Sequence, residues 1–273
     1  MINLIFKLGF SALLFFLIAA CGSSPKRLPL AIEQAKKTDQ VAHRALGDGD
    51  LMLAREMFKQ VMLLQRSMDN IPAATMAAIN LSSVNHKLGN TDESLLLLDQ
   101  ILTDHTSLLP LDLKATAAFR KGIILADNGR DEEANSALQL AKDACINPCV
   151  LTAGINNLRA RLMMKKGNFA AALAIVQGVM STATEKEEQA NAKRIAGAAN
   201  AALGQHKAAE ADYNSALILD KELALSARIA DDLLGISKAL SDQGRVAEAD
   251  EYAHRAEEVI AATRMLNSNI KTP

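Results

Sequence analysis

Six glycines recur along this chain at nearly constant spacing, and each one begins the same short pattern. An Ala or Ser lies five residues after the Gly, and an apolar or aromatic residue lies four residues later. Successive glycines are 40, 40, 38, 37 and 40 residues apart. This period is typical of stacked helical hairpins, because one hairpin cannot bury its own apolar face and needs a neighbour. The instances are Gly49, Ala54 and Phe58; Gly89, Ser94 and Leu98; Gly129, Ala134 and Leu138; Gly167, Ala172 and Val176; Gly204, Ala209 and Tyr213; and Gly244, Ala249 and Ala253.

The residues around each Gly predict a helix on either side of it. Gly ends a helix well because it adopts left-handed backbone angles without a Cβ clash. Acidic residues such as those in 131–133 follow the turn, where they complement the dipole of a new helix. A small residue lies seven positions before every Gly, which allows the two helices to approach closely: Ala42, Ser82, Gly122, Ala160, Gly197 and Ser237. No β-branched run alternates with period two, so we expect no sheet.

Together these positions resemble the tetratricopeptide repeat, with its small residue, Gly, Ala and aromatic. The resemblance covers about Ala31 to Met265 and implies an all-α, right-handed α-solenoid of about six helix-turn-helix repeats. The repeats are about 40 residues long, against about 34 in the family, so we expect longer helices. We predict a repeat domain over 31–266, a disordered tail over 267–273, and hairpins at 31–66, 71–105, 110–145, 148–182, 186–219 and 223–265.

Residues 1–20 have the features of a signal peptide. One basic residue, Lys7, precedes the apolar run Leu8–Ala20, which is too short to span a bilayer. The run ends in two alanines directly before Cys21, which resembles a bacterial lipobox. The resemblance implies cleavage before Cys21 and acylation of its thiol and its new amine, and several acyl chains together anchor a protein stably. The alternative is an ordinary secretory signal followed by an incidental Cys.

Residues 21–30 are expected to be a flexible tether that follows the lipidated Cys21. The segment Gly22–Pro29 is small and polar and contains two prolines. By analogy with bacterial sorting rules, Gly22 after the Cys favours the outer membrane over the inner one. We therefore expect the mature chain to be anchored in the outer membrane and to face the periplasm, with the leaflet left open.

The balance of charge argues against a nucleic-acid partner. Removing residues 1–20 removes only Lys7 from the 30 Lys and Arg residues, which leaves 29 against 31 Asp and Glu. Nucleic-acid binding leaves a basic footprint that this chain lacks. The chain also has no Trp and only two Tyr, which suits thin layers of closely packed helices better than one large core.

The two remaining cysteines, Cys145 and Cys149, lie at the predicted turn between the third and fourth repeats. In an oxidising envelope compartment such a pair usually forms a disulfide, and we expect a structural one here. A redox-active pair is an alternative. A metal site is another, although the spacing differs from the zinc-type C-x-x-C and no His lies nearby.

In the tetratricopeptide family the first helix of each hairpin lines the concave face. Counting back from each Gly places Ile79, Ser83, His86 and Phe119 on that face, followed by the predicted peptide-binding residues of the last three repeats. Asn amides can bond an extended peptide backbone, while Arg and Lys can hold a carboxylate. The hypothesis is a groove for an extended segment that is acidic or ends in a carboxylate, and the alternative is an ordinary solvated helix face. The predicted binding residues are Asn157, Arg161, Asn191, Arg194 and Lys238.

Catalytic motifs are absent from the sequence. It contains no H-E-x-x-H, no phosphate-binding G-x-x-x-x-G-K-[ST], and no G-x-S-x-G outside the signal. The five histidines are scattered along the chain, and no pair has metal-ligand spacing. We therefore expect no enzymatic activity, no cofactor and no metal.

The leading hypothesis is an outer-membrane lipoprotein that acts as a protein-interaction scaffold or adaptor in envelope assembly. Its fold and anchor are similar to those of repeat lipoproteins that serve type IV pili and outer-membrane protein assembly. The partner would be one or more envelope proteins of the pilus, secretion or outer-membrane machinery, or cell-wall hydrolases or synthases. The alternative is a carrier or enzyme accessory that binds a small or lipidic molecule between helices. A carrier predicts an enclosed apolar pocket and a scaffold predicts an open, polar groove; the oligomeric state stays open.

Overall fold

The computed structural model describes residues 28–104 and 108–270, and within these ranges the chain forms twelve α-helices and no strand. The predicted signal peptide, Cys21 and most of the predicted tether lie outside the described residues. None of the helices in these ranges is long and apolar enough to cross a membrane. The helices are α2 (Leu30–Gly47), α3 (Leu51–Ser67), α4 (Ile71–Lys87), α5 (Thr91–Leu102), α6 (Leu111–Asp127), α7 (Asp131–Ala144), α8 (Thr152–Lys165), α9 (Phe169–Thr182), α10 (Lys186–Ala202), α11 (His206–Glu222), α12 (Ser226–Ser241) and α13 (Val246–Ile270).

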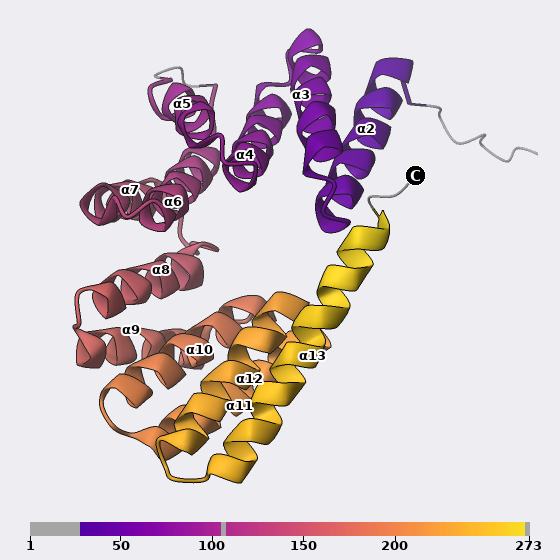
Figure 1. The fold of residues 1–273 in the computed structure, drawn as a ribbon. Coiled ribbons are helices and arrows are strands. Elements are labelled where there is room, and N and C mark those ends of the chain that lie inside the picture. Colours follow the sequence, from indigo (N-terminus) through magenta and orange to yellow (C-terminus); the bar gives the residue numbers. More distant parts are fainter. Residues whose placement is uncertain (1–27, 105–107, 271–273) are drawn as a thin grey trace, which may run out of the picture.

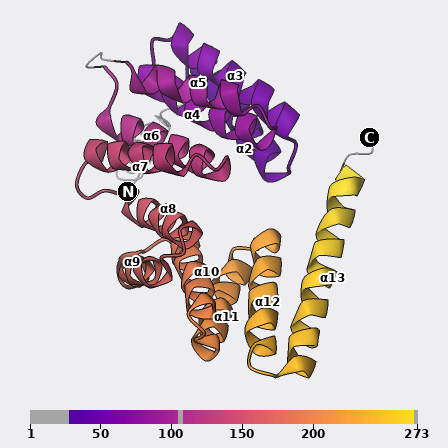
Figure 2. The ribbon, with the colours of Figure 1, turned by 60° about the vertical axis from the view of Figure 1, so that its left-hand side comes forward.

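The helices pair into six hairpins that stack along an arc (Figure 1). Each helix packs on the next one in the chain, and the first helices of successive hairpins also contact one another from α4 through to α12. In Figure 1, α4, α6 and α8 lie on the inner side of the arc, and α5, α7 and α9 lie on its outer side. The turned view places α13 at the far end of the array, packed along α12 (Figure 2). The predicted all-α repeat solenoid is confirmed.

The six repeated glycines end the first helix of each hairpin in the way the sequence predicts. All six have positive φ angles, between 74° and 84°. The N–H of the residue after each Gly donates to the carbonyl five residues before it, as from Asn90 to Asn85 and from Arg130 to Leu125, both at 2.9 Å. This is the Schellman arrangement, in which a left-handed residue lets the chain satisfy the last carbonyls of a helix.

The small residues of the pattern form the contact between the two helices of each hairpin. The Ala or Ser five residues after each Gly is 4% exposed or less in all six repeats. In the second hairpin the Ser94 hydroxyl donates to the Ser82 carbonyl, and in the sixth the Ser237 hydroxyl donates to the Ala249 carbonyl at 2.8 Å. Larger side chains such as Phe58, Leu98 and Leu138 fill the layers between hairpins. Burial of this apolar surface is the main force that holds the stack together.

The observed hairpins begin and end within five residues of the predicted ones. The largest difference is at the C-terminus, where α13 continues to Ile270. Residues 267–270 of the predicted tail are therefore helical, and no Gly or Pro interrupts this stretch before Pro273. Residues 271–273 lie outside the described part of the chain.

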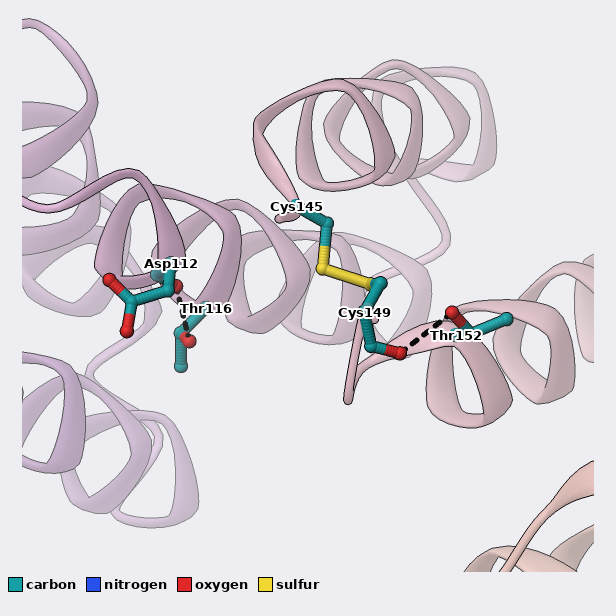
Figure 3. The surroundings of a disulfide bond; sticks show 5 residues. All are labelled: Asp112, Thr116, Cys145, Cys149 and Thr152. Atoms are coloured by element: carbon teal, nitrogen blue, oxygen red, sulfur yellow. Dashed lines mark hydrogen bonds between the residues drawn. A yellow bond between two sulfur atoms is a disulfide. The ribbon is translucent and has the colours of Figure 1, made fainter. Parts of the chain in front are cut away.

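The connection between α7 and α8 contains a disulfide between Cys145 and Cys149, with Cα atoms 5.4 Å apart (Figure 3). The same short loop contains a cis peptide bond between Asn147 and Pro148. The Thr152 hydroxyl donates to the Cys149 carbonyl at 2.8 Å, which joins the loop to the first turn of α8. The disulfide therefore closes a short covalent loop between the third and fourth hairpins.

Candidate interaction groove

The concave side of the array holds a groove of about 880 Å³, and all of its lining residues come from the first helix of a hairpin. The helices α4, α6, α8, α10 and α12 each contribute side chains. The hollow therefore crosses five successive hairpins instead of lying between two helices. Apolar side chains such as Phe119, Ile123 and Leu158 alternate in it with charged ones.

Four of the five residues predicted to bind a peptide line this groove: Asn157, Arg161, Asn191 and Arg194. Ser83, His86 and Phe119 line it as well. Lys238 does not line the groove. Its ammonium lies 3.2 Å from the carboxylate of Asp242, the residue that follows the end of α12. Ile79 is 1% exposed and belongs to the core. Counting back from each Gly therefore identified most of the groove residues correctly. It was wrong for Ile79 on α4 and Lys238 on α12, the first and last helices of the groove.

The two predicted asparagines form contacts between neighbouring first helices. Asn157 is 4% exposed, and its amide donates to the Glu188 carbonyl at 2.9 Å and to the Glu188 carboxylate at 2.7 Å. Asn191 accepts from Arg194 at 3.2 Å and also accepts from Arg228. The amide nitrogen of Asn157 is therefore used to join α8 to α10, whereas its Oδ1 atom is buried without a partner.

Arg161 on α8 forms an ion pair with a residue at the end of the neighbouring helix α6. Its guanidinium donates to the Asp127 carboxylate at 3.1 Å, and the His86 ring lies 3.3 Å from the same carboxylate. Asp127 is 36% exposed, so water screens the pair and its net contribution to stability is small. This partner on α6 is the acidic group that a ligand would have to displace from Arg161.

Arg194 lines the groove and also belongs to a largely buried cluster with two aspartates. Its guanidinium donates to Asp232 at 2.7 Å and to Asp220, and both aspartates have fully buried side chains. One guanidinium thus serves two carboxylates, and it joins α10 to the end of α11 and to α12. Because a buried charge without a partner is very unfavourable, the role of Arg194 is to compensate Asp220 and Asp232.

Arg120, which is not among the predicted binding residues, lines the groove on α6, the second of its five helices. It lies nine residues before Gly129 and directly follows Phe119, one position outside the inner-face register. Its Nε atom is buried without a hydrogen-bond partner, and burial lowers the pKa of its guanidinium. The signal available in the sequence was a cation beside an inner-face aromatic residue in the third repeat.

Comparisons with known proteins identify the fold. The sequence matches no protein-family model and no curated protein. It is similar in structure to BtubC (BKLC) from P. vanneervenii, with a TM-score of 0.60 and 14% identity over 87% of this chain and 93% of that one. It is also similar to a Rap protein complexed with Competence and Sporulation Factor, with a TM-score of 0.60 and 13% identity over 84% of this chain and 66% of that one. Both are helical-repeat proteins of the tetratricopeptide kind. The fold is of the tetratricopeptide type.

In this tetratricopeptide-type array, the Arg194 cluster contains a carboxyl that titrates near neutral pH. Burial raises the pKa of Asp232 to about 7, the Arg194 guanidinium opposes the rise, and the adjacent Asp220 carboxylate adds to it. The Asp220 Oδ1 atom is buried and has no hydrogen-bond partner, so Arg194 is the group that stabilises this carboxylate through its other oxygen. Within residues 28–104 and 108–270, no three His, Cys, Asp or Glu side chains are grouped to hold a metal ion.

The protein is expected to lose stability as the pH rises from about 4 to about 7. The folded-state pKa of Asp232 is raised from 3.8 to about 7, so across this window the native state keeps a proton that the unfolded chain releases. The free energy of unfolding therefore falls with increasing pH. Asp232→Asn mimics the protonated acid and should flatten this dependence, as measured by urea denaturation across the window. Asp231→Asn, an exposed neighbour on α12, is the matched control, and an unchanged slope in Asp232→Asn would contradict the assignment.

Proposed function

We propose that this chain is an outer-membrane-anchored lipoprotein that faces the periplasm and acts as a protein-interaction scaffold in envelope assembly. It holds an extended segment of a partner protein in its concave groove. The partner belongs to the pilus, secretion or outer-membrane machinery. The observation that carries the proposal is the groove itself, which five first helices build from polar, charged and apolar side chains.

The sequence at the N-terminus supports the location. The apolar run Leu8–Ala20 ends directly before Cys21 in a lipobox-like pattern, and Gly22 favours the outer membrane over the inner one. The disulfide between Cys145 and Cys149 is compatible with an oxidising compartment such as the periplasm.

The form of the groove supports a scaffold over a carrier. A carrier of lipidic molecules needs an enclosed, mostly apolar cavity, whereas this hollow has Arg161, Lys165, Glu187 and Asp231 along its walls. The structurally similar Rap protein, solved with Competence and Sporulation Factor, shows that an array of this fold can hold another molecule. We infer that the concave face of this chain holds a segment of its partner.

Site-specific crosslinking in living cells tests the proposal. A photo-crosslinking amino acid at Ser83, which lines the groove, should capture one envelope protein. The same amino acid at Ala174, exposed on α9, should not. Cys21→Ser should abolish labelling by a fatty-acid analogue and release the chain from the membrane fraction. Crosslinks that are equal from both positions would refute the groove, and lipid labelling that survives Cys21→Ser would refute the anchor.

A further inference from the structure

Arg120 is a partly buried cation of the groove whose guanidinium has no partner. Among the described residues, no hydrogen bond or ion pair reaches it, and its Nε atom is fully covered. Its two Nη groups are not covered in this way and make no hydrogen bond to residues 28–104 or 108–270. They are therefore the donors that Arg120 has available for a molecule in the groove.

The other arginines of the groove, and Lys165, have partners among the described residues. Arg161 pairs with Asp127, Lys165 lies 3.0 Å from Asp131, and Arg194 is held by its two buried aspartates. The negative charge of Glu187 acts on Arg120 from a distance, but the carboxylate of Glu187 forms its ion pair with Arg228, at 3.5 Å. Within the described residues, Arg120 is thus the one arginine lining the groove that has no hydrogen-bond or ion-pair partner; Lys87 has none either, but its side chain is exposed.

Keeping a guanidinium partly buried and unpaired is unfavourable for folding. Its planar fork matches the two oxygens of a carboxylate, and the resulting charge-assisted pair of hydrogen bonds is both strong and directional. Phe119, Ile123 and Leu158 line the same part of the groove, so an apolar side chain can pack beside the carboxylate. The chemistry that suits the site is an acidic group with an apolar group next to it.

The length of the groove selects a polypeptide over a small anion. Five first helices are separated by four intervals of about 8–10 Å each and therefore span about 32–40 Å. An extended segment of about 11 residues covers this distance, whereas a free anion would occupy Arg120 alone.

We propose that the groove binds an extended segment of a partner protein in which an Asp or Glu carboxylate pairs with the Nη groups of Arg120. An apolar side chain near that acid lies on Phe119 and Ile123. This inference rests on the proposed function, because it names the chemistry of the partner at the same groove. It also moves the anchoring cation from Arg161 and Arg194 to Arg120.

Selection from a phage library of random linear 12-residue peptides tests the inference on the immobilised full-length chain. The unaltered protein should enrich peptides with Asp or Glu at one fixed position beside an apolar residue. Arg120→Gln should remove the acidic preference and weaken the selected peptides by about tenfold to a hundredfold, the usual effect of losing a charged hydrogen-bonded pair. Arg120→Lys keeps the positive charge but loses the planar guanidinium, so its affinity for the selected peptides should lie between those of the unaltered protein and Arg120→Gln. Arg161→Gln is the matched control, since its guanidinium is already paired with Asp127, and it should keep the preference.

The outcomes separate this inference from the proposed function. If the enriched peptides have no fixed acidic position, the role of Arg120 is overturned. The same holds if they have one and neither Arg120→Gln nor Arg120→Lys changes the preference for it. In both cases the groove would still bind peptides. Failure to enrich any peptide would overturn both. Binding of free N-acetylglutamate in an Arg120-dependent manner, without peptide enrichment, would replace the polypeptide by a small anion and would also overturn the inference.

Discussion

Replacing Arg194 by Met is expected to lower the free energy of unfolding by about 3–5 kcal/mol near neutral pH. The substitution keeps most of the side-chain volume but removes the only cation that contacts the fully buried carboxyls of Asp220 and Asp232 within the described residues. Two acids then remain in a medium that solvates charge poorly. The loss should be smaller in mild acid, where the carboxyl of Asp232, whose pKa burial raises to about 7, is protonated.

Urea denaturation followed by circular dichroism measures this effect. Arg161→Met is the matched control, because it removes a groove arginine whose partner, Asp127, is 36% exposed, and it should cost less than about 1 kcal/mol. Hydrogen exchange should show the loss of protection concentrated in α10 to α12, since a repeat array is stabilised mainly by contacts between neighbours. Equal losses in the two variants would mean that the cluster does not hold the fifth and sixth hairpins together.

Local rules made the fold predictable from the sequence. A Gly that ends a helix and an Ala that lets two helices approach act over a few residues, and their six-fold recurrence fixed the hairpins to within five residues. The positive φ angles of Gly49, Gly129 and Gly244 follow from the same local rule. Non-glycine residues Asp69 and Ala224 also adopt positive φ at turns between hairpins, and nothing in the period distinguished them.

The charges of the groove were not predictable in the same way, because their partners lie far apart in the sequence. Arg194 finds Asp220 and Asp232 at separations of 26 and 38 residues, beyond any contact within one helix. The inner-face register could therefore identify Arg194 and Arg161 as groove residues but not show that both are already paired. For the same reason it could not show that Arg120, directly after the inner-face residue Phe119, is the groove arginine without a partner among the described residues.

Two glycines inside helices form a close contact with an aromatic side chain, which the sequence pattern predicted only in part. Gly197 was predicted to allow a close approach, and the structure shows Tyr213 of α11 as the side chain that approaches it. A Cβ added at Gly197 would lie 2.9 Å from the Tyr213 ring, and one added at Gly235 on α12 would lie 2.5 Å from it. The ring is therefore held between two bare stretches of helix backbone, which explains why the fifth and sixth hairpins pack closely.

Gly235→Ala is expected to destabilise the protein by about 1–3 kcal/mol, the usual effect of overpacking a core. The Tyr213 ring cannot retreat from the new methyl group, because Gly197 already lies against the ring. The matched control is Gly178→Ala in α9, where nothing lies within 4 Å of the added Cβ. That change should stabilise the chain by up to about 1 kcal/mol through helix propensity alone. Thermal denaturation of both variants, and of Gly235→Ala in a Tyr213→Leu background, separates the two effects. If the cost of Gly235→Ala persists at full size without the Tyr213 ring, a clash with that ring is not its cause.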